Sequence, residues 1–130
     1  MIGVQTLLAG SAFTIQVVVQ EDVSPVVTFL REELEQPERM KIGFLLEQIA
    51  EHGLPHNEEK FRNEGNGIYA IKAQVVRLYG FFDGQRKMTL THGFKKNARG
   101  GKNAQARQRE RAEHLRSLLL AERAREGRGR

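Results

Sequence analysis

Residues 68–92 read IYAIKAQVVRLYGFFDGQRKMTLTH, and this stretch decides the fold. Branched and aromatic side chains dominate it, which is typical of strands. Gln74 interrupts the first run, and Asp83-Gly84 is a strong signal for a two-residue hairpin turn. The stretch therefore predicts three consecutive antiparallel strands, at 68–73, 75–82 and 86–92.

The segments before this meander predict one further strand and two helices. Residues 13–19 (FTIQVVV) form the strand, and Ser24-Pro25 supplies a helix N-cap followed by proline at the first helical position. Pro37 either ends that helix or opens the next one. The second helix is predicted from apolar residues at helical spacing, and it ends before Gly53. These residues are Ile42, Leu45, Leu46 and Ile49.

The order of these elements predicts an α+β domain with a small antiparallel sheet, built from a strand, a two-helix hairpin and a three-strand meander. We expect residues 57–67 to form a loop, and residues 93–102 to form a second, basic loop. A basic helix is expected over 103–124. Its apolar stripe is Ala112, Leu115 and Leu119, and Arg109, Arg116 and Arg123 lie along its flank.

The length of 130 residues fits one domain, which we place at 1–124. Residues 1–12 are expected to be an extended lead-in, and 125–130 a disordered basic tail. The first 20 residues carry no charge but are too polar and too short to span a bilayer, so we expect neither a signal peptide nor a membrane segment. The absence of Cys excludes a disulfide framework and fits a reducing compartment, the cytoplasm.

Charge is distributed unevenly along the chain. Residues 1–93 hold 9 Lys or Arg and 12 Asp or Glu, a net charge of −3, whereas residues 94–130 hold 12 and 4, a net charge of +8. Such asymmetry favours a polyanionic partner, nucleic acid or an acidic protein segment. The alternative is a solvated basic tail.

The chemistry-bearing residues exclude several kinds of site. His52 and His56 are separated by Gly53 and Pro55, which break any helix that would place them on one face, so we expect no metal site. No glycine-rich loop follows a strand in the way that nucleotide cofactors need, so we expect no cofactor. The remaining cationic and hydroxyl side chains suit attack of an RNA 2′-hydroxyl on its neighbouring phosphate, because fixed cations stabilise the transition state without a metal. They are Lys72, Arg77, Tyr79, Lys87, His92, Lys95, Lys96 and Arg99.

Strand alternation assigns some of these side chains to a face. Val76, Leu78, Gly80 and Phe82 are expected to face the core. Arg77, Tyr79 and Phe81 then share the other face, where exposed rings beside a cation would suit single-stranded RNA. Exposed sheet aromatics without function are the alternative. His92 has the parity of Met88 and Leu90 and so faces the core, unless Gly93 introduces a bulge.

The stretch from Gly67 to Lys96, GIYAIKAQVVRLYGFFDGQRKMTLTHGFKK, resembles the HigB-like, phage-derived branch of the RelE/ParE toxin superfamily. The segment FLLEQIAEHG at 44–53 and the basic last helix are also similar to that family, and the resemblance extends over roughly residues 13–120. The chain differs from the branch after Phe94, where Asn97 falls at a position expected for one of two paired lysines, and at two positions of the meander. Ala70 stands where an acidic residue is usual, and Lys72 where arginine is frequent.

The resemblance implies a RelE-like fold and a function as the toxin of a type II toxin–antitoxin system. The toxin would be a metal-independent endoribonuclease that cleaves mRNA, commonly on the ribosome, and a cognate helix-turn-helix antitoxin would inhibit it. Arg77 would stabilise the phosphate, Lys95 or Lys96 would bind or protonate it, and His92 would be a candidate acid or base. The residues expected to contact RNA are Lys72, Tyr79, Lys87, Arg99, Arg109 and Arg116.

Two other functions remain open at this point. The same fold would suit a ParE-like toxin that inhibits a topoisomerase by protein contact without catalysis, because fold does not determine function. The second alternative is a non-catalytic nucleic-acid-binding protein, a relic of a phage. Its main support is Ala70, which stands where the branch usually has an acidic residue.

Overall fold

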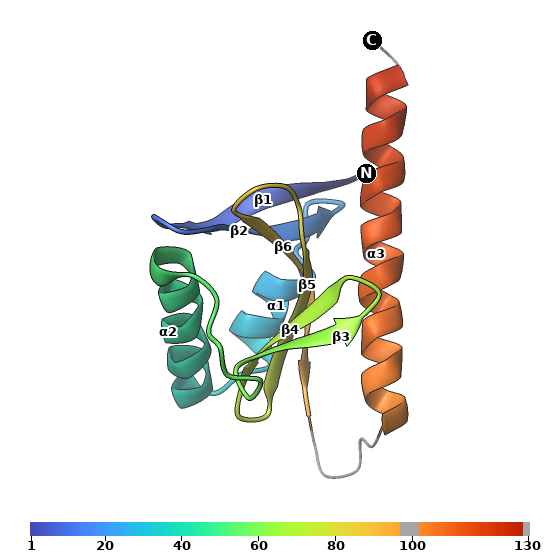
Figure 1. The fold of residues 1–130 in the computed structure, drawn as a ribbon. Coiled ribbons are helices and arrows are strands. Elements are labelled where there is room, and N and C mark those ends of the chain that lie inside the picture. Colours follow the sequence, from blue (N-terminus) through green and yellow to red (C-terminus); the bar gives the residue numbers. More distant parts are fainter. Residues whose placement is uncertain (97–101, 129–130) are drawn as a thin grey trace.

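The structure is a computed structural model that describes residues 1–96 and 102–128. One six-stranded sheet, in the order β1-β2-β6-β5-β4-β3, lies between helices α1 and α2 on one face and α3 on the other (Figure 1). The predicted α+β class is confirmed. The elements are β1 (Ile2–Ala9), β2 (Thr14–Gln20), α1 (Pro25–Glu32), α2 (Gln36–His52), β3 (Phe61–Gly65), β4 (Ile68–Ala73), β5 (Val76–Phe82), β6 (Lys87–Lys95) and α3 (Lys102–Arg128).

The sheet is mixed, so the prediction of an antiparallel sheet is only partly right. The meander β4-β5-β6 is antiparallel as expected. β2, however, pairs with β6 in parallel, from Thr14 opposite Lys87 to Val17 opposite Leu90. A hairpin turn dictates the direction of its two strands, whereas β2 and β6 are joined by a long connection that leaves their relative direction to tertiary packing.

The expected lead-in forms a strand. β1 pairs antiparallel with β2, and a bulge between Thr6 and Leu8 divides it into two parts. Ile2 and Val4, before the bulge, pack against the residues beneath α3, while Leu8 packs on the side of α1 and α2. The bulge therefore lets one strand contribute to both cores.

The expected loop before the meander also contains a strand. β3 pairs with β4 through the turn at Asn66-Gly67, where both residues adopt positive φ, 54° and 79°. These angles are those of the tight turns that join antiparallel strands. The ring of Phe61 stacks on that of Tyr69 at 5.2 Å, which anchors β3 to its neighbour.

Both helices on the first face begin at the predicted signals. The side chain of Ser24 accepts a hydrogen bond from the Val27 amide at 3.2 Å, and Pro25 is the first residue of α1. Pro37 lies in the first turn of α2 and so opens that helix, one of the two alternatives predicted for it. The predicted apolar face of α2 is buried against the sheet, which fixes the orientation of the opposite, exposed face. The buried residues are Ile42, Leu45, Leu46, Ile49 and Ala50.

α3 and the turn before β6 both extend beyond their predicted limits. α3 continues to Arg128, so a disordered tail from residue 125 is wrong at least as far as that residue, and residues 129–130 lie outside the described part of the chain. The β5-β6 turn runs from Asp83 to Arg86, longer than two residues. Gly93–Lys95, expected to belong to a basic loop, complete β6.

Candidate functional site

Lys72 and Arg77 face each other across strands β4 and β5. Like charges in directly opposite positions are unfavourable in a sheet unless something compensates them. Arg77 donates hydrogen bonds to the carbonyls of Gln74 and, at 3.1 Å, Val76, and Lys72 donates to the Glu58 carbonyl at 3.2 Å. Within residues 1–96 and 102–128, neither cation has a carboxylate within 4.0 Å.

The electrostatic environment of this pair is positive. Burial lowers the pKa of Lys72, and the charges of Arg77 and Arg62 lower that pKa further. Glu64 is the acid best placed to neutralise Arg77, but its carboxylate lies 3.8 Å from Arg62 instead. Burial also lowers the pKa of Arg77, although Tyr79 and Glu64 oppose that shift. Among the described side chains, Glu64 acts on the pair only at longer range, and neither cation forms an ion pair.

The two lysines at the end of β6 have different environments. The Lys95 ammonium lies 2.9 Å from the carboxylate of Glu38 in the first turn of α2. Lys96 is exposed, and its backbone amide donates to the Val75 carbonyl at 2.7 Å, which holds it beside the β4-β5 turn. The charge of Lys96 also contributes to the lowered pKa of Lys72. Of the two candidates, Lys96 is therefore the one that joins the Lys72–Arg77 pair.

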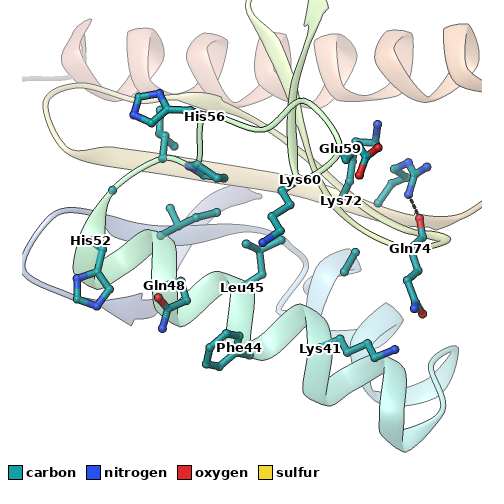
Figure 2. A pocket seen from close by; sticks show the side chains of 16 residues that line it. Lys41, Phe44, Leu45, Gln48, His52, His56, Glu59, Lys60, Lys72 and Gln74 are labelled. Atoms are coloured by element: carbon teal, nitrogen blue, oxygen red, sulfur yellow. Dashed lines mark hydrogen bonds between the residues drawn. The ribbon is translucent and has the colours of Figure 1, made fainter.

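A groove of about 870 Å³ begins at this pair and runs between α2 and the segment that follows it (Figure 2). Leu45 and Ile49 contribute apolar surface to it. Its described lining residues include four cations and one carboxylate, that of Glu59. The cations are Lys41, Lys60, Lys72 and Arg77.

One wall of the groove was not predicted from the sequence. Lys41, Phe44, Gln48 and His52 lie along α2 at spacings of three and four residues, which places them on one helix face. That face is the one left exposed by the buried residues of α2, so the helical periodicity carried a usable signal. Only the fold shows that this face lies opposite Lys72 and Arg77.

His92 does not face the core of Met88 and Leu90. Tyr79 pairs with His92 and Gly80 with Leu90, so Thr91 is an extra residue that turns His92 towards α3. Its ring is 1% exposed, stacks on Tyr79 with centroids 5.1 Å apart, and lies 2.9 Å from the Gln108 side-chain oxygen. Burial, followed by the charge of Arg111, lowers the pKa of His92 to about 4. The imidazole is thus neutral at pH 7 and shielded from RNA.

The expected aromatic platform on β5 is covered. The alternation prediction is correct for Val76 and Leu78, which face α1 and α2, but Tyr79 and Phe81 are buried beneath α3. Burial raises the pKa of Tyr79 to about 12, and Glu64 adds to that shift. The expectation of exposed rings is therefore wrong, because α3 covers this face of the sheet.

The arginine stripe of α3 contacts the protein itself. Arg116 donates to the Asn66 carbonyl at 2.9 Å and lies over the Phe81 ring, and Arg123 makes two hydrogen bonds of 2.8 Å to Asp83. Arg109 passes beside Gly65, and its buried Nε has no hydrogen-bond partner among the residues that the structure describes. Arg116 and Arg123 dock α3 on two hairpin turns. Arg116 is therefore not on a free flank as predicted, whereas RNA contact by Arg109 stays a prediction.

The other predicted residues lie away from the groove or outside the described chain. Lys87 begins β6, and eight residue steps separate it from Lys95, a distance of about 26 Å along the strand. Arg99 lies outside the described residues. Ala70 is fully buried opposite Tyr79 in the core beneath α3, so the acidic residue usual at this position would need a buried partner here.

The described residues, 1–96 and 102–128, also bear on the presence of metal sites and of membrane-spanning helices. They contain no group of three or more His, Cys, Asp or Glu side chains that could hold a metal ion. No helix in them is long and apolar enough to cross a membrane.

No curated protein matches the chain. Residues 30–117 match the family described as Phage derived protein Gp49-like (DUF891). The matched region runs from α1 to the middle of α3 and includes the groove, the Lys72–Arg77 pair and Lys96. The phage-derived assignment made from the sequence is thereby confirmed at the level of the family. The chain belongs to the Gp49-like family of phage-derived proteins.

Proposed function

We propose that this protein is the HigB-like toxin of a type II toxin–antitoxin system, a metal-independent endoribonuclease that cleaves mRNA. The observation that carries the proposal is the Lys72–Arg77 pair, two adjacent cations that lack a carboxylate partner in the described chain. A phosphate is the group that would compensate them, since a guanidinium can donate two parallel hydrogen bonds to its oxygens. Lys96 adds a third cation beside the pair, and membership of a phage-derived family supports the assignment as a toxin.

The reaction would use the substrate's own nucleophile. The RNA 2′-oxygen forms a bond to the adjacent phosphorus while the bond from phosphorus to the 5′-oxygen breaks, leaving a 2′,3′-cyclic phosphate and a 5′-hydroxyl. Arg77 would stabilise the charge that develops on the phosphate oxygens. One proton leaves the 2′-hydroxyl and one reaches the 5′-oxygen. Lys72 is our candidate for exchanging a proton because its pKa is lowered, and Lys96 would bind the phosphate.

In this proposal His92 and Tyr79 would take no part in the reaction, because both are buried beneath α3. Lys95 would contribute to the positive potential while paired with Glu38. The protein would act in the cytoplasm on mRNA, including mRNA on the ribosome. A helix-turn-helix antitoxin with acidic side chains would cover the groove and inhibit the toxin by electrostatic complementarity.

Substitution of Arg77 tests the proposal in a purified translation system with one mRNA. Arg77→Ala should lower the cleavage rate on the order of a hundredfold, equivalent to about 3 kcal/mol of transition-state stabilisation, while RNA affinity falls much less. Arg77→Lys should recover only part of the rate, since it offers a point charge. Arg31→Ala is the matched control, because Arg31 is an exposed arginine of α1 that does not line the groove.

Three results would contradict the proposal. Arg77→Ala with a lower melting temperature but an unchanged cleavage rate of the folded protein would assign Arg77 a structural role. A wild-type protein that leaves mRNA intact but inhibits a purified topoisomerase would be a ParE-like toxin. A wild-type protein that does neither, and whose expression leaves growth unchanged, would be a non-catalytic relic.

A further inference from the structure

The face of α2 that lines the groove exposes an aromatic ring. Phe44 is 62% exposed, although the neighbouring Leu45 and Leu46 are buried in the core. Met40, one turn earlier, is equally exposed but does not line the groove. Burial in the core therefore does not account for Phe44.

The surroundings of Phe44 combine charge with hydrogen-bonding capacity. On the same helix face, Lys41 precedes the ring and Gln48 and His52 follow it, while Lys60 comes from the segment after α2 (Figure 2). An exposed ring beside cations is the arrangement that single-stranded nucleic acids use, because the ring stacks on a base and the cations contact the backbone. The positive lining disfavours a neutral, apolar occupant.

The lining of the groove extends from the β4-β5 turn to the end of α2. Lys72 and Gln74 lie at its β4-β5 end, and His52 lies at the end of α2 (Figure 2). A strand whose scissile phosphate is held at Lys72 and Arg77 can extend along α2 through the groove, because the groove is lined by both. The contacts at Phe44 would then involve a nucleotide next to the cleavage point and not the reacting phosphate.

We propose that the α2 wall, defined as Lys41, Phe44, Gln48 and His52, is a binding track for single-stranded RNA that reads the nucleotides flanking the cleavage site. A base stacks on Phe44, Lys41 and Lys60 contact phosphates, and the Gln48 amide and His52 ring offer hydrogen bonds to base edges. The α2 wall would therefore set the sequence preference. This inference rests on the proposed function, since the nuclease site determines which nucleotides reach α2.

Binding is tested separately from cleavage with a short, fluorescent single-stranded RNA whose 2′-hydroxyls are methylated and which therefore cannot be cleaved. Phe44→Ala should weaken its binding about tenfold, the usual effect of losing one base stack. Phe44→Tyr should retain the affinity because it retains a ring. Met40→Ala removes an equally exposed apolar side chain of α2 from outside the groove and should leave the affinity unchanged.

Salt dependence and cleavage kinetics give two further measurements. Lys41→Gln should reduce the slope of log affinity against log salt by about 0.7, the contribution of one phosphate contact on a single strand. In cleavage of unmodified RNA, Phe44→Ala should raise KM about tenfold and change kcat little, whereas Arg77→Ala should lower kcat. Melting temperatures of all variants show whether each is folded.

The outcomes separate this inference from the nuclease proposal. If wild-type RNA cleavage depends on Arg77 while Phe44→Ala and Met40→Ala bind RNA equally well, the track is wrong and the nuclease stands. If the methylated RNA binds in a Phe44-dependent way but no RNA is cleaved, the nuclease is wrong and the track stands. Equal, Phe44-dependent binding of polyglutamate would overturn the RNA assignment in favour of an acidic protein segment.

Discussion

The burial of His92 predicts how the stability of the protein depends on pH. The folded protein keeps the imidazole neutral, with a pKa of about 4, against an ordinary value of 6.5. Between these values the unfolded chain binds one more proton than the folded chain, so the free energy of unfolding falls as pH falls. A difference of 2.5 pKa units corresponds to about 3 kcal/mol, and the loss should be about 1.4 kcal/mol per pH unit between 6.5 and 4.

Urea unfolding of wild type and His92→Gln as a function of pH measures this contribution. The glutamine can still donate a hydrogen bond to Gln108 but does not titrate. Between pH 6.5 and about 5, the wild-type free energy of unfolding should fall by about 2 kcal/mol more than that of the variant. This range lies above the lowered pKa values of Glu38 and Asp83, whose stabilising contributions are lost only at lower pH.

His114→Gln is the matched control. It makes the same substitution at a histidine that is exposed on α3, so it should leave the pH dependence of the wild type unchanged. Parallel pH curves for wild type and His92→Gln would refute the reasoning, since they would show that His92 titrates equally in both states. The cleavage rate of folded His92→Gln near neutral pH should equal that of wild type. A large loss of rate without a loss of stability would return His92 to the reaction.

Three further predictions concern an ion pair and two glycines. A double-mutant cycle of Asp83→Asn and Arg123→Ala in urea unfolding should give a coupling free energy of about 0.5–1 kcal/mol. The coupling is small because the Arg123 side chain is 38% exposed and water screens the pair. Zero coupling would contradict the docking role of this contact. Gly93→Ala should lower the free energy of unfolding by about 1–3 kcal/mol, because its methyl group would lie 2.2 Å from the Phe29 ring. Gly43 lies within α2, and a methyl group added there would have no neighbouring atom within 4 Å. Gly43→Ala should therefore stabilise the protein by about 0.5–1 kcal/mol. Equal effects of the two glycine substitutions would contradict this account.

The elements that could be predicted from the sequence are those with local signals. Ser24-Pro25 and Pro37 mark helix starts whatever the rest of the chain does, and the β-branched runs of the meander form strands around short turns. β3 was missed although Asn66-Gly67 is a hairpin signal, because its sequence, FRNEG, is polar and belongs to an edge strand. β1 was missed because its pairing with β2 and its bulge are not visible in its own composition.

The residues of the candidate site also fall into two groups, those that a local pattern predicts and those that only the folded chain brings together. The sequence by itself singled out Lys72, Arg77 and Lys96 as candidate site residues, and strand alternation alone opposed Arg77 to the apolar face of β5. Whether a face meets solvent is a property of the whole chain, and only the tertiary structure decided it. α3 docks through Arg116 and Arg123 and buries Tyr79 and Phe81, and one extra residue at Thr91 turns His92 under the same helix. The groove exists because the exposed face of α2 comes to lie opposite a turn far from it in sequence, and no local pattern records that approach.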